Sequence, residues 1–257
     1  MKTDRLLSPL QTGAITTLLC LALGLLTTGA APPEKLPAAG GDITLHPINH
    51  ATLTLEWNGK TVYVDPVGDA AAFASAPGPD LIVITHIHGD HFSGATLTKV
   101  AVAKTKLLVP PSVAEKMPEA LKAQTTALTN GETVTVAGIE VEAVPAYNLT
   151  PARANFHPKG RDNGYVITLG GKRLYFSGDT EDVPEMRALK NIDAAFLAMN
   201  LPYTMDVAKA ADAVKAFKPA VVYPYHYRGA DLQEFKRLVG TEAGVEVRLR
   251  DWYAPAR

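Results

Sequence analysis

Short apolar runs alternate with polar segments along most of the chain, and their lengths favour strands over helices. Residues 51–57 and 61–64 alternate between apolar and polar positions, which is typical of half-buried strands, and the Asn58-Gly59 pair between them is a strong hairpin signal. The continuous apolar run 81–84 predicts a fully buried strand. Further strands are expected at 43–46, 81–85, 106–109, 132–136, 139–145, 164–169, 172–177, 193–198, 220–225 and 245–249.

Helices are expected between these strands. Within 206–217, apolar residues recur three or four positions apart, which predicts a helix with one face against the core. Four other segments are expected to be helical: 91–103, 111–117, 183–189 and 230–239. Strands with interleaved helices and no internal repeat predict an α/β fold in a single domain.

The first thirty residues differ from the rest of the chain. Lys2 and Arg5 precede an apolar segment over 14–26, and small residues follow at 28–31. This order is typical of a secretory signal peptide, and the apolar segment is short for a membrane span. We therefore expect a signal peptide at 1–31, a linker at 32–41 and the folded domain at 42–252. The protein is then exported to the periplasm or secreted; an uncleaved membrane anchor is the alternative.

Composition narrows the possible partners. The chain has 257 residues, is 47% hydrophobic and carries 25 basic and 26 acidic residues without a basic run. Such a charge argues against nucleic acid as a substrate and favours a small molecule. Cys20 is the only cysteine and lies inside the predicted signal peptide. The mature protein would therefore form no disulfide and would use no thiolate as a nucleophile or metal ligand.

Three histidines and an aspartate stand directly after the apolar run 81–84, in the sequence Thr85-His86-Ile87-His88-Gly89-Asp90-His91. Residues that follow a buried strand lie where an α/β sheet places its ligand-binding loops. Imidazole and carboxylate are also the ligands that zinc and similar divalent ions prefer. We expect His86 and His88 to bind one metal, and Asp90 and His91, at the start of the next helix, to bind a second.

The pattern His-x-His-x-Asp-His resembles the signature of the metallo-β-lactamase superfamily. The resemblance implies a four-layer αβ/βα sandwich over about 42–252 and a site for two divalent metal ions, with zinc the first candidate and manganese or iron the alternatives. It also implies an aspartate that bridges both metals and a final histidine on the second metal. Asp179 is the candidate for the bridge, because it lies in the sequence Ser177-Gly178-Asp179-Thr180. His226 follows an apolar strand and is the candidate for the second metal.

The third histidine of the family pattern is missing from its usual place. The strand expected at 139–145 is followed by Asn148, and the nearest imidazole is His157. Three interpretations stay open: His157 is the third ligand of the first metal, Asn148 takes that place through its carbonyl oxygen, or His157 binds substrate.

Other polar residues match positions that line the site in lactonase-like and phospholipase-like branches of the superfamily. Asp65 would accept a hydrogen bond from a ligand histidine, and His50 would line the site; the alternatives are a turn residue and an ordinary loop histidine. Arg153, Lys159, Arg161 and Arg228 lie in loops near the expected metals and together would bind an anionic group, although loop cations are usually solvated. The segment 200–204 follows a buried strand and is expected to shape the pocket.

The resemblance implies hydrolysis by a metal-bound hydroxide that Asp90 orients, passing a proton to the leaving group. The residues are most similar to the branch that contains L-ascorbate-6-phosphate lactonase and N-acyl-phosphatidylethanolamine phospholipase D. A lactone or a phosphodiester in a small, anionic molecule is therefore the leading substrate. A β-lactam hydrolase and a metal-binding or sensing protein without turnover are the alternatives.

Overall fold

In the computed structural model, which describes Met1 and residues 34–241 and 244–253, the strands form two seven-stranded sheets. The first sheet has the order β1 (Glu34–Leu36), β2 (Ile43–Asn49), β3 (Thr52–Trp57), β4 (Lys60–Val64), β5 (Leu81–Val83), β6 (Lys106–Val109) and β7 (Thr125–Ala127). The second sheet contains β8 (Thr133–Val136), β9 (Ile139–Ala146), β10 (Asp162–Leu169), β11 (Lys172–Phe176), β12 (Ala194–Ala198), β13 (Val221–Tyr225) and β14 (Glu246–Val247). Because neighbours in each sheet are consecutive in the chain, each half of the domain builds one sheet.

Each sheet combines an antiparallel part with a parallel part. In the first sheet β1 to β4 are antiparallel and β4 to β7 are parallel. In the second sheet β8 to β11 are antiparallel and β11 to β14 are parallel. Parallel strands are covered on both faces and consist of continuous apolar runs, which explains why every residue of β5 and β12 is buried. Their carboxyl ends are the usual position of ligand sites in such sheets.

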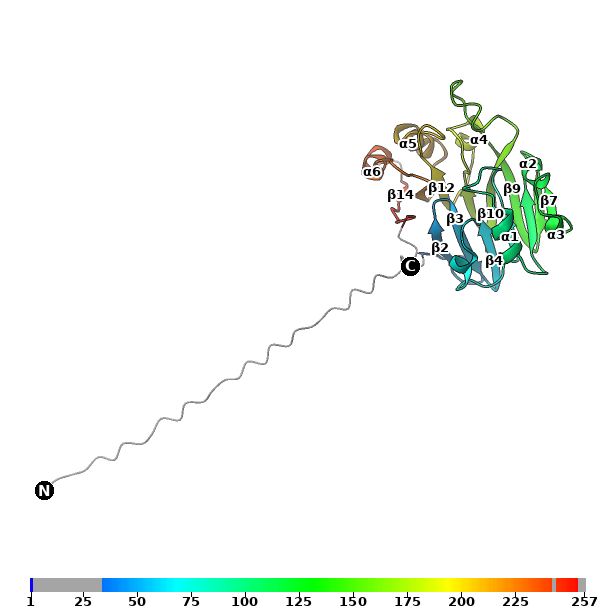
Figure 1. Cartoon of the computed structure of the whole chain (residues 1–257). Coiled ribbons are helices and arrows are strands. Elements are labelled where there is room, and N and C mark those ends of the chain that lie inside the picture. Colours follow the sequence, from blue (N-terminus) through cyan, green and yellow to red (C-terminus); the bar gives the residue numbers. More distant parts are fainter. Residues whose placement is uncertain (2–33, 242–243, 254–257) are drawn as a thin grey trace.

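The two sheets pack face to face, and helices cover their outer faces. Leu53 and Val83 of the first sheet meet Phe176 and Phe196 of the second in the central core. The outer face of the second sheet packs on α4 (Pro184–Arg187), α5 (Val207–Phe217) and α6 (Leu232–Val239). The outer face of the first sheet packs on the 3-10 helix η1 (Ala70–Phe73), α1 (Gly94–Val100), α2 (Pro111–Ala114) and α3 (Glu119–Lys122). These layers, visible in Figure 1, are the predicted αβ/βα sandwich in a single domain.

Most of the predicted strands are present close to their predicted ends, but the linker prediction was wrong at residues 34–36, and several helices are shorter than predicted, with α2 ending at Ala114 and α4 at Arg187. Residues 34–36, expected in a linker, form β1 because Leu36 is buried in the central core and Glu34 pairs with Arg248 and Arg250. The helix expected at 91–103 is shorter, since Ser93 caps it and α1 begins at Gly94. The motif's Asp90 and His91 therefore lie in the turn before that helix.

The predicted signal peptide, apart from Met1, lies outside the described residues, so export stays a prediction. In the part of the chain that the structure describes, no helix is both long enough and apolar enough to cross a membrane.

Candidate metal centre

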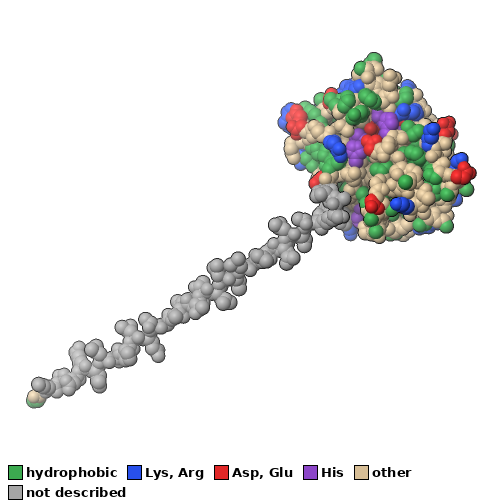
Figure 2. Space-filling model, in the orientation of Figure 1, with side chains coloured by type: hydrophobic (Ala, Val, Ile, Leu, Met, Phe, Trp, Pro, Cys, Tyr) green, Lys and Arg blue, Asp and Glu red, His purple; other side chains and the backbone are tan. Residues whose placement is uncertain are grey.

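Six of the seven histidines gather on one side of the molecule, in turns and loops that follow strands. They follow the parallel strands β5 and β13, the long strand β9, and the β2–β3 turn: His50, His86, His88, His91, His157 and His226. The seventh, His46, lies on β2 and pairs with Glu56 at 3.2 Å. Figure 2 shows the histidine atoms around an acidic spot on one face of the protein.

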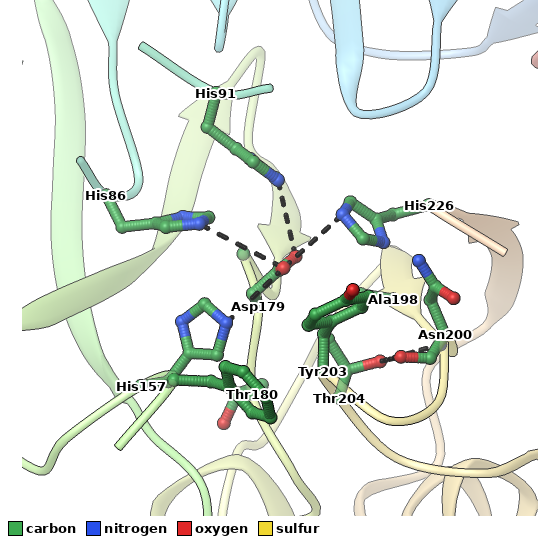
Figure 3. Close-up of polar contacts among 12 residues, drawn as sticks. His86, His91, His157, Asp179, Thr180, Ala198, Asn200, Tyr203, Thr204 and His226 are labelled. Atoms are coloured by element: carbon green, nitrogen blue, oxygen red, sulfur yellow. Dashed lines mark hydrogen bonds and ion pairs between the residues drawn. The ribbon is translucent and has the colours of Figure 1, made fainter. Parts of the chain in front are cut away.

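The clustered residues form two groups with one carboxylate between them. His86, His88 and His157 offer ligand atoms within 4.8 Å of one another, and so do His50, Asp90, His91 and His226. In Figure 3 the carboxylate of Asp179 lies in the middle of four imidazoles. The structure therefore brings together the residues that the sequence nominated for two metals.

The distances around Asp179 fit ligands that share a metal ion. The Nε2 atoms of His91, His157 and His226 lie 3.4, 3.5 and 3.3 Å from its carboxylate oxygens. Two ligands that each lie about 2.0–2.1 Å from one tetrahedral zinc ion are roughly 3.3 Å apart. His157 belongs to the first group, and His91 and His226 belong to the second, so the carboxylate of Asp179 lies between the two groups.

Several buried atoms of the cluster find no hydrogen-bond partner among the described residues. They are Nε2 of His86, His91, His157 and His226, and Oδ1 of Asp179. Buried polar atoms are normally paired, and each unpaired one costs about 1–3 kcal/mol. Divalent cations would satisfy all of these atoms together. The residues present therefore fit a metal centre.

The opposite ring nitrogen of two of these histidines is held by a carboxylate. Nδ1 of His91 lies 2.7 Å from Oδ2 of Asp65, and Nδ1 of His157 lies 3.1 Å from Oδ2 of Asp162. Contacts of this kind fix the orientation of a ligand histidine and leave its Nε2 free for metal. Asp65 thus lies where the sequence placed it, whereas Asp162 was not predicted.

Three residues of the site adopt backbone conformations that favour glycine. His50, Asp65 and His226 have φ values of 57°, 45° and 47°. Hydrogen bonds hold this backbone in place, because His226 N donates to His50 O at 3.1 Å and Asp65 N donates to Val83 O at 3.0 Å. Strained non-glycine residues of this kind concentrate at functional sites.

Gly178 allows the end of β11 to approach the end of β5. Its φ is 59°, and an added Cβ would lie 2.9 Å from Cβ of Thr85 and 3.1 Å from the carbonyl oxygen of Asn163. Thr85 Oγ1 in turn lies 2.9 Å from Nδ1 of His86. The glycine of Ser-Gly-Asp-Thr therefore sets the spacing between Asp179 and the first histidine of the motif.

Asp90 is held at the opening of the cluster by His50. Nε2 of His50 lies 3.1 Å from Oδ2 of Asp90, and its Nδ1 lies 2.6 Å from the hydroxyl of Tyr253, a residue that was not predicted. Burial opposes the charge of Asp90, but the neighbouring imidazoles of His226 and His50 outweigh it and hold its pKa well below the usual range. With half of its side chain exposed, Asp90 is an anion within reach of a substrate.

Burial and charge set the protonation of the central residues. Burial lowers the pKa of His86 and His88, so both are neutral near pH 7. Burial opposes the charge of Asp179, but the imidazoles around it outweigh this and hold its pKa well below the usual range. Burial also opposes the charge of His91, yet Asp179 and Asp65 raise its pKa well above the usual value. A metal ion would therefore displace a proton from His91, whereas His86, His88 and Asp179 already have the protonation state that a metal ligand needs.

The cluster opens into a cavity of about 690 Å³. Residues from both sheets line it: Asn49, His50, Val67, His88, Asp90, Phe156, His157, Asp179, Asn200, Tyr203, His226 and Arg228. The segment 200–204 thus contributes two lining residues, as expected.

The four loop cations expected to bind substrate lie in different places, and Arg153 pairs with Glu181 at 2.6 Å. Arg228 lines the cavity. Lys159 instead pairs with Glu185 at 3.8 Å, and Arg161 pairs with Asp162 at 2.7 Å. Arg161 therefore contacts Asp162, the carboxylate that holds His157. Substrate binding by Lys159 and Arg161 stays an untested prediction.

Asn148 joins two loops beside the cavity. Its Nδ2 donates to the carbonyl oxygens of Tyr203 at 2.8 Å and Arg153 at 3.1 Å. His157, in contrast, points Nε2 at the cluster. Its position favours His157 over Asn148 as the third ligand of the first metal.

Comparisons with known proteins point to one family. Residues 44–226 match the domain family described as the Beta-lactamase superfamily domain. A relative from Pyrococcus abyssi, named UPF0173 metal-dependent hydrolase, is 33% identical over 215 residues, which cover 78% of this chain and 93% of the relative.

Solved structures show the same likeness. A protein from Parabacteroides distasonis described as a metal-dependent hydrolase has a TM-score of 0.78 and 39% identity, covering 85% of this chain and 97% of its own. Igni18, a metallo hydrolase from Ignicoccus hospitalis, has a TM-score of 0.67 and 25% identity, covering 81% of this chain and 95% of its own.

Proposed function

This chain belongs to the metallo-β-lactamase superfamily, and on that premise we propose that it is a metal-dependent hydrolase of an ester-type bond, a lactone or a phosphodiester. The observation that carries the proposal is the carboxylate of Asp179 among the buried Nε2 atoms of His86, His91, His157 and His226, which have no hydrogen-bond partner among the described residues. Two divalent ions, zinc first and manganese or iron as alternatives, would supply a Lewis acid and a water molecule of lowered pKa when bound there.

The two groups divide the ligands between them. His86, His88 and His157 would hold the first ion, Asp90, His91 and His226 the second, and Asp179 both. Asp65 and Asp162 orient the rings of their histidine partners.

Asp90 is the residue best placed to move a proton. Its carboxylate lines the cavity and is anionic at neutral pH, and His50 holds its orientation. A carboxylate in this position orients the attacking water and passes its proton to the leaving oxygen.

The position of Arg228 at the cavity is an argument for an anionic substrate. The guanidinium is exposed at the cavity and forms no ion pair with another described residue. It lies 5.2 Å from the centre of the Tyr253 ring, which restrains it. A cation held in this way is suited to bind a phosphate or carboxylate group of the substrate.

Metal content and turnover of the purified, zinc-loaded protein test this function. We expect close to two ions per chain by elemental analysis, and hydrolysis of bis(4-nitrophenyl) phosphate or of a simple γ-lactone. His88→Ala and His226→Ala should each lose metal and activity because each removes a ligand. His46→Ala is the matched control, since His46 lies outside the cluster, and it should keep both.

The outcome that refutes the proposal is retention of both ions and full turnover in His88→Ala or His226→Ala. Absence of turnover on both substrate classes in a protein that holds two ions would leave a binding protein in place of a hydrolase. Turnover confined to a chromogenic cephalosporin would assign the bond to a β-lactam.

A further inference from the structure

Large hydrophobic side chains are exposed next to the metal cluster. We call Leu149, Phe156, Leu201 and Tyr203 the apolar rim; each is 36–52% exposed. In the described part of the chain, the other large hydrophobic side chains exposed to this degree are Met1 and Val102. Single exposed apolar residues are ordinary, but a contiguous group beside a cavity marks a binding surface.

The apolar rim is built from two loops that lie side by side. Leu149 and Phe156 belong to the loop after β9, and Leu201 and Tyr203 to the loop after β12. Asn148 Nδ2 donates to Tyr203 O at 2.8 Å and so joins the loops, and the rings of Phe156 and Tyr203 pack edge to face with centres 5.1 Å apart.

A buried carboxylate holds the rim in shape. Glu181 accepts hydrogen bonds from the backbone nitrogens of Leu149 at 3.0 Å and Thr150 at 2.9 Å, and it pairs with Arg153 at 2.6 Å. Arg153 also donates to the carbonyl oxygen of Thr204 at 3.1 Å, in the second loop. A surface fixed before binding loses little conformational entropy when a ligand covers it.

The rim continues directly into the cavity. Phe156 and Tyr203 line the same space as His157 and Asp179, and Phe156 precedes His157 in the chain. Arg228 lines it as well, two residues after His226. The cavity thus combines an apolar wall, the metal cluster and a cation. In Figure 2 hydrophobic atoms lie next to the histidines on this face.

We propose that the substrate carries an apolar group, an acyl chain or an aromatic ring, that packs on Phe156 and Tyr203 while its hydrolysable group lies at the metal cluster. The inference rests on the proposed function, which it narrows to amphiphilic esters, lactones or phosphodiesters. Covering the rim with such a group removes apolar surface of both partners from water, whereas a wholly polar substrate leaves the rim exposed.

Binding of a series of n-alkylphosphonates, methyl to octyl, to the zinc-loaded protein tests the inference by calorimetry. The phosphonate mimics the polar group and is not hydrolysed. We expect Kd to fall about two- to fourfold with each added methylene that reaches the rim. Phe156→Ser and Tyr203→Ser should flatten this dependence, and both side chains are exposed, so the fold should survive.

Two control variants separate the rim from general effects. Val102→Ser changes an exposed apolar residue that does not line the cavity and should keep the wild-type dependence on chain length. Arg228→Ala should weaken every phosphonate by a similar factor and leave the dependence on chain length unchanged, because it removes charge and not apolar surface.

A Kd that does not change with chain length, or a dependence that Phe156→Ser and Tyr203→Ser leave intact, would overturn the inference. Binding to phosphatidylcholine vesicles that the rim variants abolish, with a flat phosphonate series, would overturn it too and assign the rim to a lipid surface. Length-dependent binding without turnover of any ester, lactone or phosphodiester would refute the proposed function, and the rim would then be a binding site for an apolar ligand and not for a substrate. Turnover with a Kd that does not depend on chain length would support the proposed function and overturn the inference about the apolar rim.

Discussion

The ring of His157 is fixed from two sides, with Nδ1 3.1 Å from Asp162 and Nε2 3.5 Å from Asp179. We therefore expect His157→Ala to lower the metal content from two ions toward one and to reduce kcat strongly, because it removes a ligand. Asn148→Ala, a neighbour in the same loop, should keep both ions. Elemental analysis and steady-state kinetics of the two variants measure these effects.

Other results would assign His157 differently. If it binds substrate, His157→Ala should keep both ions and act through kcat/KM. If Asn148 is the ligand, the metal loss should occur in Asn148→Ala instead.

At the scale of single residues, the candidate ligands that share a motif were predictable from the sequence, and so was Asp65, whereas Asp162 and Tyr253 were not. The histidines and aspartate of 85–91 leave one strand end together, so their pattern alone predicts a common site. Tyr253 meets His50 across 203 positions of the chain, and no local pattern connects the two. His157 reaches the cluster through a loop and not from a strand end, which is why spacing alone left Asn148 open.

At the scale of elements, Asp80 joins the beginning of β5 to β4. Its carboxylate accepts from Thr61 N at 3.0 Å and pairs with Lys104 at 3.0 Å, and its own nitrogen donates to Thr61 O at 2.8 Å. Burial opposes the charge, but the contacts with Thr61 and Lys104 outweigh it and lower the pKa of Asp80.

Replacing Asp80 should therefore have an effect that depends on pH. Asp80→Asn should reduce the free energy of unfolding by about 1–2 kcal/mol at pH 7. Because the folded-state pKa is lowered, this stabilisation is complete above the ordinary value of 3.8 and is lost as the pH falls through the folded-state value. Urea unfolding of both metal-free proteins between pH 7 and 3 should show the difference shrinking on acidification. A difference that grows toward low pH would contradict the assignment.

Helices and strands whose side chains are buried could be predicted from the sequence, because burial leaves a pattern of apolar residues. β12 is buried along its whole length, and its apolar run identifies it. β7 exposes two of its three side chains and α3 is a single turn, so neither leaves a periodic signal. β1 depends on its pairing with β2 and on contacts with the far end of the domain, which local sequence does not encode.

At the scale of the whole molecule, the candidate ligands come from both sheets. The 85–91 motif follows β5 of the first sheet, whereas Asp179 and His226 follow β11 and β13 of the second. Ions bound to this set join the two sheets in the folded state and not in the unfolded chain. Metal binding should therefore stabilise the domain as a unit.

Removal of the metal should lower the thermal stability of the whole domain. An ion present at 100 times its Kd adds about 2.7 kcal/mol, and each kcal/mol shifts Tm by about 2–4 °C in a domain of this size. We therefore expect EDTA to lower Tm by roughly 5–10 °C in one cooperative calorimetric transition. His46→Ala should show the same shift, and His226→Ala a smaller one. An unchanged Tm on chelation, in protein shown to lose its ions, would contradict a metal that joins the sheets.

The order of strands along the chain also bears on biosynthesis. Because each sheet is built from consecutive strands, the ribosome delivers the first sheet, with the 85–91 motif, before any strand of the second. His226 follows β13, the last strand but one, so a nascent chain carries an incomplete ligand set during most of its translation. If these residues hold the metal as proposed, tight metal capture is expected late in maturation. Under the proposed ligand assignment, a product truncated before β13 would lack a ligand of the second ion, and metal retention would then distinguish finished chains from unfinished ones.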